Sequence, residues 1–357
     1  MYSFLVRYQT PVLLILALGA IVVFGTLAAN NAAVSLTEML IQMTVVVGLY
    51  VFIGNSGIVS FGHIGFMCIG AYAAAWASAD PAFKEIMLEG LPLFLREGQF
   101  PFPVAMAAAI VLPAAAAALF GLAIMRLTGI ASSIATFAFL IIVNSVYSNW
   151  NSVTAGVSSI IGIPTVVGPW TAFAVASVAI LVAYVFQTSR YGLLLRASRD
   201  DEVAARASAI NVIGMRLLAF VLSAALVGAG GGLYAQFLGI LTVDSFYLSL
   251  SFIAIAMLVV GGMSSLTGAV LGVVAVTAIV QILRAAERGI PVGSMTWALP
   301  SGSQELGLGI LLAVILIYRP TGLSGGQEVR LPVRPSSAAA KEQAAIDNRI
   351  LAARQRS

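Results

Sequence analysis

The sequence predicts an all-α, polytopic membrane helix bundle with about ten spans. Of its 357 residues, 60% are hydrophobic and only 9% are charged, and the mean hydropathy is +1.02. A soluble domain carries about 25% charged residues, so this chain lacks the polar surface that folding in water requires. Apolar stretches of about 20 residues recur, which suits helices that cross a hydrocarbon core about 30 Å thick. The alternating segments typical of a membrane β-barrel are not found.

The spans are predicted from apolar stretches bounded by charges and turn residues. They are 11–29, 36–53, 62–78, 103–125, 129–147, 168–188, 216–241, 251–262, 266–283 and 304–318. The first stretch is too long for a secretory signal peptide and lacks a strong cleavage signal, so we interpret it as a span. The eighth and last spans are short, and the eighth and ninth can also be interpreted as one interrupted element.

The positions of Lys and Arg predict the orientation, because cytoplasmic loops carry an excess of both. Ten spans place both termini on one side. Placing them in the cytoplasm puts 14 of the 18 basic residues inside. Residues 1–323 then form a transmembrane domain with a cytoplasmic loop at 190–216, and residues 324–357 form a basic cytoplasmic tail. The net charge of +4 follows from this distribution and does not indicate nucleic-acid binding.

Two uncharged segments rich in Gly and Ser interrupt the apolar pattern, and we predict broken or re-entrant helices near 54–65 and 261–267. Non-helical backbone at membrane depth survives only where protein or a watery cavity satisfies it. Two such interruptions, one in each half, point to a transport site between structural repeats. Close helix packing is the alternative, as we expect for Gly228 and Gly232. The predicted translocation path comprises Asn55, Ser56, Ser60, His63, Gly261, Gly262, Ser264 and Ser265.

Few side chains within the spans can carry chemistry. His63, the only histidine, either ties its break to a neighbouring helix by a hydrogen bond or serves as a solute contact or proton relay. The single cysteine, Cys68, excludes an internal disulfide or a cysteine metal cluster. Glu38 and Gln42 share a helix face near the outer end of the second span. They are expected at the membrane interface or facing a watery vestibule.

The loop at 190–216 holds the densest charge cluster in the chain. A helical pattern runs over 200–209, with acidic residues at its start, where they favour the helix dipole. Glu202 and Arg206 have the spacing of an ion pair, and Ala204 and Ala205 leave a small face suited to a groove on another protein. A solvated loop helix is the alternative. Because exposed ion pairs contribute about 0–1 kcal/mol, losing Glu202 should matter less than a bulky residue at Ala205.

Three segments resemble the membrane subunit of bacterial branched-chain amino-acid ABC importers. They are "NSGIVSFGHIGFMCIGAYAAA", "RASRDDEVAARASAINVIGMRLLAFVLSAALVGAGGGLYA" and "YRPTGL", and the resemblance extends from about Gly48 to Leu323. It implies a multi-pass permease of the bacterial inner membrane. It also implies a second related permease, two cytoplasmic ATPase subunits and a periplasmic binding protein as partners. Ala209 stands where the family commonly has glycine, which affects only the local end of the helix.

The resemblance also assigns contact with the ATPase to the charged loop. The residues concerned are Arg199, Asp200, Asp201, Glu202, Ala204 and Ala205, with Arg206 as the partner of Glu202. The chain itself has no GxxxxGK[ST] phosphate loop, and neither of its two lysines lies in a Gly-rich segment. We therefore expect no enzymatic activity and no cofactor in this chain, with ATP bound by a partner.

The predicted function is passage of branched-chain or similar neutral amino acids from a periplasmic binding protein into the cytoplasm. A permease for urea or short amides is an alternative, because the uncharged breaks do not distinguish among small solutes. A self-sufficient secondary transporter is another, but it would usually need coupling carboxylates buried mid-membrane, and Asp and Glu are absent from the interior of every span except for Glu38, near an end. A membrane enzyme would need a nucleophile–base set or a metal cluster, and the sequence offers neither.

Overall fold

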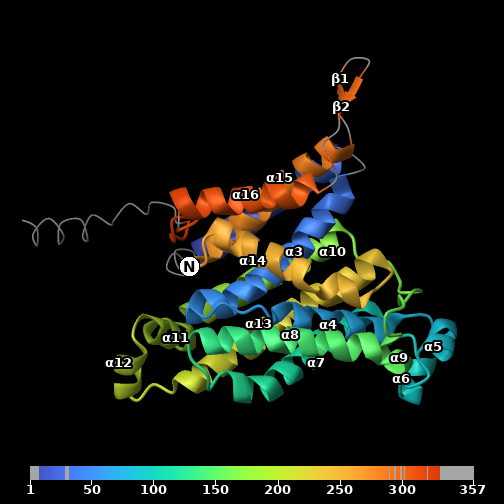
Figure 1. The fold of residues 1–357 in the computed structure, drawn as a ribbon, viewed down its shortest axis with the longest axis horizontal. Coiled ribbons are helices and arrows are strands. Elements are labelled where there is room, and N and C mark those ends of the chain that lie inside the picture. Colours follow the sequence, from blue (N-terminus) through green and yellow to red (C-terminus); the bar gives the residue numbers. More distant parts are fainter. Residues whose placement is uncertain are drawn as a thin grey trace, which may run out of the picture.

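The computed structural model describes residues 8–28, 32–288, 290–292, 295–297, 300, 302–319 and 321–329, and within them the chain is a bundle of long helices (Figure 1). The helices are α2 (Gln9–Ala28), α3 (Ala32–Ser56), α4 (His63–Ser78), α5 (Pro81–Met87), α6 (Leu93–Glu97), α7 (Phe102–Ile124), α8 (Ile130–Asn149), α9 (Asn151–Thr154), α10 (Pro169–Thr188), α11 (Arg190–Asp200), α12 (Glu202–Ala207), α13 (Val212–Leu238), the 3-10 helix η1 (Val243–Phe246), α14 (Leu248–Gly261), α15 (Leu266–Arg288) and α16 (Ser303–Tyr318).

Each of the ten predicted spans corresponds to a long helix, so the prediction of an all-α, multi-pass bundle is confirmed. In the described part of the chain, eight segments are long and apolar enough to cross a membrane, and η1 and α14 together make one of them. The other two predicted spans, α4 and α16, have 16 residues each. Two short strands, β1 (Ile290–Val292) and β2 (Met295–Trp297), form an antiparallel hairpin after α15 that the sequence did not predict.

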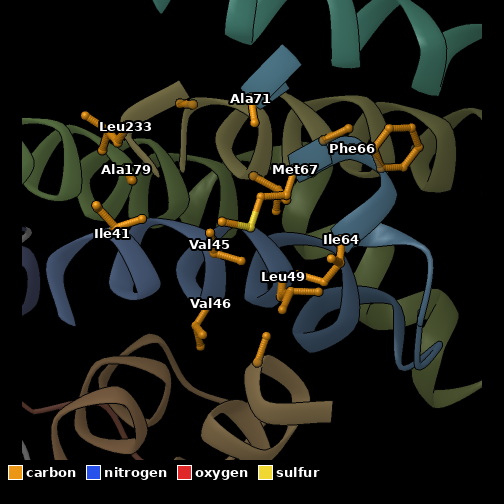
Figure 2. Packing of buried hydrophobic residues seen from close by; sticks show 14 of the residues in the cluster. Ile41, Val45, Val46, Leu49, Ile64, Phe66, Met67, Ala71, Ala179 and Leu233 are labelled. Atoms are coloured by element: carbon orange, nitrogen blue, oxygen red, sulfur yellow. The ribbon is translucent and has the colours of Figure 1, made fainter. Parts of the chain in front are cut away.

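Helix α3 lies at the centre of the bundle. It is apolar on all sides, and 89% of its spanning window is buried, against 28% for α2, α7 and α8. The outer helices instead expose large apolar side chains, as expected where lipid is the solvent. In Figure 2, Val45 and Leu49 of α3 lie beside Ile64 and Met67 of α4, and Val46 points away from α4. A helix with this pattern can pack against neighbours on every side.

Glycines let α13 approach two neighbours closely. A Cβ atom on Gly231 would overlap the backbone of α4 at Met67, and one on Gly228 would overlap the carbonyl oxygen of Ala109 in α7. A Cβ atom on Gly232 would come within 2.6 Å of the Ala109 side chain. The packing role predicted for Gly228 and Gly232 is therefore confirmed.

Helices α14 and α15 form a hairpin with the same kind of backbone contact. A Cβ atom on Gly261 would overlap the carbonyl group of Gly268, and one on Gly272 would overlap the carbonyl oxygen of Met257. At these crossings no side chain separates the two backbones. We call this unit the α14–α15 hairpin. The boundary along which the hairpin packs against α3 is called the seam.

Candidate functional site

The first break follows the end of α3. The predicted break at 54–65 is present but shorter, because α3 continues to Ser56 and α4 begins at His63. Gly57 has a φ of +73°, which favours glycine. The Asn55 Nδ2 atom donates to the Val51 carbonyl oxygen at 3.0 Å, and the Ser56 hydroxyl donates to that of Phe52 at 2.7 Å. The side chains of these two predicted path residues therefore hydrogen-bond to the backbone of their own helix, α3.

His63 lies inside an aromatic cluster. Its Nδ1 atom is 2.7 Å from the hydroxyl oxygen of Ser60, and both residues are 1% exposed. Its ring lies 5.4–6.0 Å, centroid to centroid, from the rings of Phe52, Phe66 and Phe220. The geometry favours the hydrogen-bonding alternative. The bond joins the first residue of α4 to Ser60 within the same break, however, and not to a neighbouring helix.

The second break lies between α14 and α15. The helices end at Gly261 and begin at Leu266, so the non-helical part of the predicted 261–267 segment is 262–265. Gly262 has a φ of +116°, and the Ser265 hydroxyl oxygen accepts a hydrogen bond from the Gly268 amide at 2.9 Å. Gly261, Gly262 and Ser265 are all buried, whereas Ser264 is exposed.

Residues after α16 fold back onto this break, which sequence reasoning missed. The amides of Leu323 and Ser324 donate to the carbonyl oxygens of Val260 and Gly261 at 2.9 and 3.0 Å. Glu328 then accepts hydrogen bonds from the amides of Leu266 and Thr267 at 2.8 and 3.0 Å, and from the Thr267 hydroxyl at 2.6 Å. These amides begin α15, where the backbone has no partner within the helix. Glu328 lies in the predicted tail, where nothing in the sequence indicates that it contacts the start of α15. Residues 330–357 of the predicted tail lie outside the described residues.

We predict that Glu328→Ala destabilises the chain by about 0.5–2 kcal/mol, the usual range for losing a helix N-cap. Amide hydrogen exchange over residues 262–270 should accelerate at the same time, because the first amides of α15 lose their acceptor. Gln327→Ala is the matched control, since Gln327 is exposed one position earlier. Equal exchange rates in the Glu328→Ala variant and the unchanged chain would contradict the capping role.

The two breaks meet at one end of the seam. They line a cavity of about 150 Å³ formed by Ile53, Gly54, Gly57, Val59, Arg199, Met263 and Ser264. A Cβ atom on Gly54 would come within 2.6 Å of the Met263 carbonyl oxygen, so the last turn of α3, just before the first break, packs closely against the second break. Of the eight predicted path residues, Ser264 lines this cavity and the other seven are buried.

Arg199 connects the charged loop to the first break. Its Nη1 atom donates to the Gly54 carbonyl oxygen at 2.8 Å. Its methylene groups lie against Gly57, where a Cβ atom would come within 2.6 Å of the Arg199 Cγ atom. The resemblance predicts a coupling role for Arg199 but does not indicate what Arg199 contacts in its own chain.

The loop itself forms two helices, α11 and α12, which lie together at one end of the bundle in Figure 1. The predicted helix at 200–209 is corrected accordingly. Asp200 ends α11, and the Asp201 carboxylate caps α12 by accepting from the amides of Val203 and Ala204, each at 2.9 Å. Ala205 is 4% exposed and packs within the chain, whereas Ala204 is exposed and Val203 is 79% exposed. The face open to a partner therefore includes Val203 and Ala204 but not Ala205.

Glu202 joins α12 to α13. The predicted pair with Arg206 is present at 2.6 Å, but the same carboxylate also binds Arg216 at 2.8 Å. The Arg216 side chain is 6% exposed. Partial burial acts to raise the pKa of Glu202, but the hydrogen bonds from Arg216 and Arg206 outweigh it and leave the pKa lowered. Glu202 thus stays ionised as a fixed link to a buried guanidinium.

A second cavity, of about 200 Å³, lies near the other end of the seam. Glu38, Met39 and Gln42 of α3 line one wall, and residues of α13, α14 and α15 line the rest. Glu38 pairs with Arg284 of α15 at 3.3 Å. The vestibule expected for Glu38 and Gln42 is therefore a cavity in this structure. Among the described residues, no three His, Cys, Asp or Glu side chains are grouped so as to hold a metal ion.

Comparison with known proteins places these features in a family. The family model described as "Branched-chain amino acid transport system / permease component" matches residues 31–318. The high-affinity branched-chain amino acid transport system permease protein LivM of Salmonella typhimurium strain LT2 is 27% identical over 346 residues, covering 87% of this chain and 74% of LivM. LivM of Escherichia coli K12 is 27% identical over 342 residues, covering 86% and 73%. No solved structure matches the chain. The match spans the helices that form both breaks and the charged loop, and the chain therefore belongs to the family of branched-chain amino acid transport permeases, the non-catalytic membrane components of ABC transporters.

Proposed function

We propose that this chain is the membrane-spanning subunit of an ATP-driven importer. It would pass branched-chain or similar neutral amino acids from a periplasmic binding protein into the cytoplasm of a bacterium. A second related permease, two cytoplasmic ATPase subunits and the binding protein complete the transporter. The observation that carries the proposal is the bond from Arg199 of the charged loop to Gly54 at the first break. It joins the segment richest in charge to the segment where the membrane helices are interrupted.

The charge distribution supports the orientation of the proposed importer. With α11 and α12 in the cytoplasm, both termini are cytoplasmic and 14 of the 18 basic residues lie inside. The cavity at the two breaks then faces the cytoplasm, and the cavity beside Glu38 faces the periplasm. We propose the seam between α3 and the α14–α15 hairpin as the translocation path, because a cavity lies toward each of its ends.

The coupling step of the proposal uses α12 as the contact with an ATPase. Val203 and Ala204 are exposed and small enough to enter a groove. Glu202 transmits displacement of α12 to Arg216 of α13, and Arg199 of the adjacent α11 transmits it to the first break. Two separate connections thus lead from one exposed face into the membrane helices.

Reconstitution tests the proposed function directly. The chain is assembled with its partner permease, ATPases and binding protein in proteoliposomes, and ATP-dependent uptake of L-leucine, L-isoleucine, L-valine and urea is measured. We expect uptake of at least one branched-chain amino acid, and no ATP hydrolysis by the purified chain alone. ATP hydrolysis by the chain alone would contradict a separate ATPase, and uptake of urea without any amino acid would assign the transporter to the amide-type alternative.

A further inference from the structure

We propose that the cavity beside Glu38 is a binding site for a zwitterionic amino acid with an aliphatic side chain. The inference rests on the proposed import function and deepens it, because it assigns a substrate class to particular residues of this chain. The cavity lies between α3, α13, α14 and α15, away from the two breaks and the charged loop. The cavity carries two opposite charges, polar atoms without a partner among the described residues, and an apolar wall.

The charges of this cavity match those of a free amino acid. Glu38 and Arg284 come from opposite walls, α3 and α15, and both side chains are 34% exposed. An α-ammonium group fits Glu38, and an α-carboxylate fits the planar guanidinium of Arg284. The pair meets through a contact of 3.3 Å, and partly exposed pairs of this kind contribute little to stability. A ligand that carries both charges can therefore separate the two side chains and satisfy each of them.

Two polar atoms that line the cavity have no hydrogen-bond partner among the described residues. Gln42 is 7% exposed, and its Oε1 atom accepts no hydrogen bond from any of the described residues. The hydroxyl of Thr277 on the facing wall is likewise without a partner in the described part of the chain. Buried polar atoms are normally hydrogen-bonded, so two orphans lining one cavity indicate a polar occupant. The Gln42 carbonyl oxygen can accept from an ammonium group that also binds Glu38, one helical turn away.

The remaining wall selects an aliphatic side chain. It is formed by Met39, Leu250, Ile253, Met257 and Val280. The volume of about 200 Å³ is far larger than the roughly 10–15 Å³ that one water needs by this measure. Urea would leave both the apolar wall and the ion pair unused, and a second carboxylate would be repelled by Glu38. These features together favour leucine, isoleucine or valine over urea and over acidic amino acids.

Cysteine protection tests the site without relying on uptake. Gln281, which lines the cavity, is replaced by cysteine in a Cys68→Ser background, and the complete transporter in nanodiscs is treated with a water-soluble maleimide. We expect L-leucine to slow labelling. 4-Methylpentanoate and 3-methylbutylamine, which each lack one of the two charges, should slow it much less. Glu38→Gln and Arg284→Gln should each raise the leucine concentration for half protection about tenfold, as expected for one charge-assisted hydrogen bond. Glu89→Gln, at an exposed glutamate outside the cavity, should leave it unchanged.

A charge exchange separates binding from a structural role. The double variant Glu38→Arg with Arg284→Glu keeps an ion pair but presents the two charges in reversed positions, so leucine protection and uptake should stay low while assembly is normal. Wild-type protection in this variant would show that the pair is only structural and overturn the inference. Leucine uptake without any leucine protection at position 281 would overturn the site but leave the proposed function standing. Protection without uptake would support the site and overturn the proposed function.

Discussion

Replacing Arg199 by alanine should uncouple ATP hydrolysis from amino-acid uptake in the reconstituted transporter. We expect uptake to fall about 30-fold, within the 5–150-fold range typical of coupling between two sites, while ATP hydrolysis continues. The reason is geometric. The guanidinium binds the Gly54 carbonyl oxygen, and its methylene groups cover Gly57, so the variant loses the contact between α11 and the first break. Uptake and ATPase rates measured on the same proteoliposomes check the prediction.

Arg190→Ala is the matched control for this experiment. Arg190 also lies on α11, but its guanidinium is exposed, lies over the Tyr191 ring at 4.8 Å and donates to the Tyr191 hydroxyl at 2.7 Å. Its loss removes the same charge without touching a break, so uptake should change less than twofold. If both variants reduce uptake equally, the charge of the loop matters and the Gly54 contact does not.

Replacing Glu202 by alanine should destabilise the chain by about 3 kcal/mol, because removing the carboxylate leaves the buried guanidinium of Arg216 uncompensated. Among the described residues, Arg216 Nε and Nη1 have no hydrogen-bond partner, and Nη2 binds Glu202. The variant therefore leaves a 6% exposed guanidinium without that acceptor. The sequence alone predicted a small effect, because it paired Glu202 only with Arg206 in an exposed ion pair. A large loss of stability would contradict that expectation. Thermal unfolding of the purified chain in detergent measures the loss.

Arg206→Ala supplies the comparison for Glu202. It removes the other partner of the same carboxylate, but its side chain is 54% exposed. The cost should stay below about 1 kcal/mol, as for surface ion pairs in general. A stability loss of similar size in Arg206→Ala and Glu202→Ala would mean that the bond to Arg216 contributes nothing beyond an exposed pair.

The contrast between Arg206 and Arg216 shows what a sequence of this kind can predict. Glu202 and Arg206 are neighbours on one helix, so their spacing alone predicted the contact. Arg216 lies on the next helix, and its distance from Glu202 depends on how the chain turns between α12 and α13. Hydrophobic stretches likewise predicted every long helix, because a span must supply about 20 apolar residues.

The breaks were predicted for the same local reason, but their lining was not. Gly and Ser content located both interruptions, since such backbone is rare at membrane depth. It did not indicate that Asn55, Ser56 and His63 turn toward their own helix or break, or that Gly54, Gly57 and Met263 line the cavity. Which side of a residue faces an opening depends on helix rotation, and a helix that is apolar on all sides carries no pattern that reveals it.

The glycine contacts inside the α14–α15 hairpin have a mechanical consequence. Carbonyl groups of each helix lie so close to glycines of the other that an added Cβ atom would collide with them, and sliding would bring residues that do carry a Cβ atom into these positions. The α14–α15 hairpin should therefore tilt against α3 as one rigid body. Gln42 lines one cavity and Ile53 the other, so the closed stretch of the seam is about 16 Å long at 1.5 Å per residue of helix. That is roughly half of the 30 Å hydrocarbon core, so a solute following this route would meet a barrier thinner than the membrane itself.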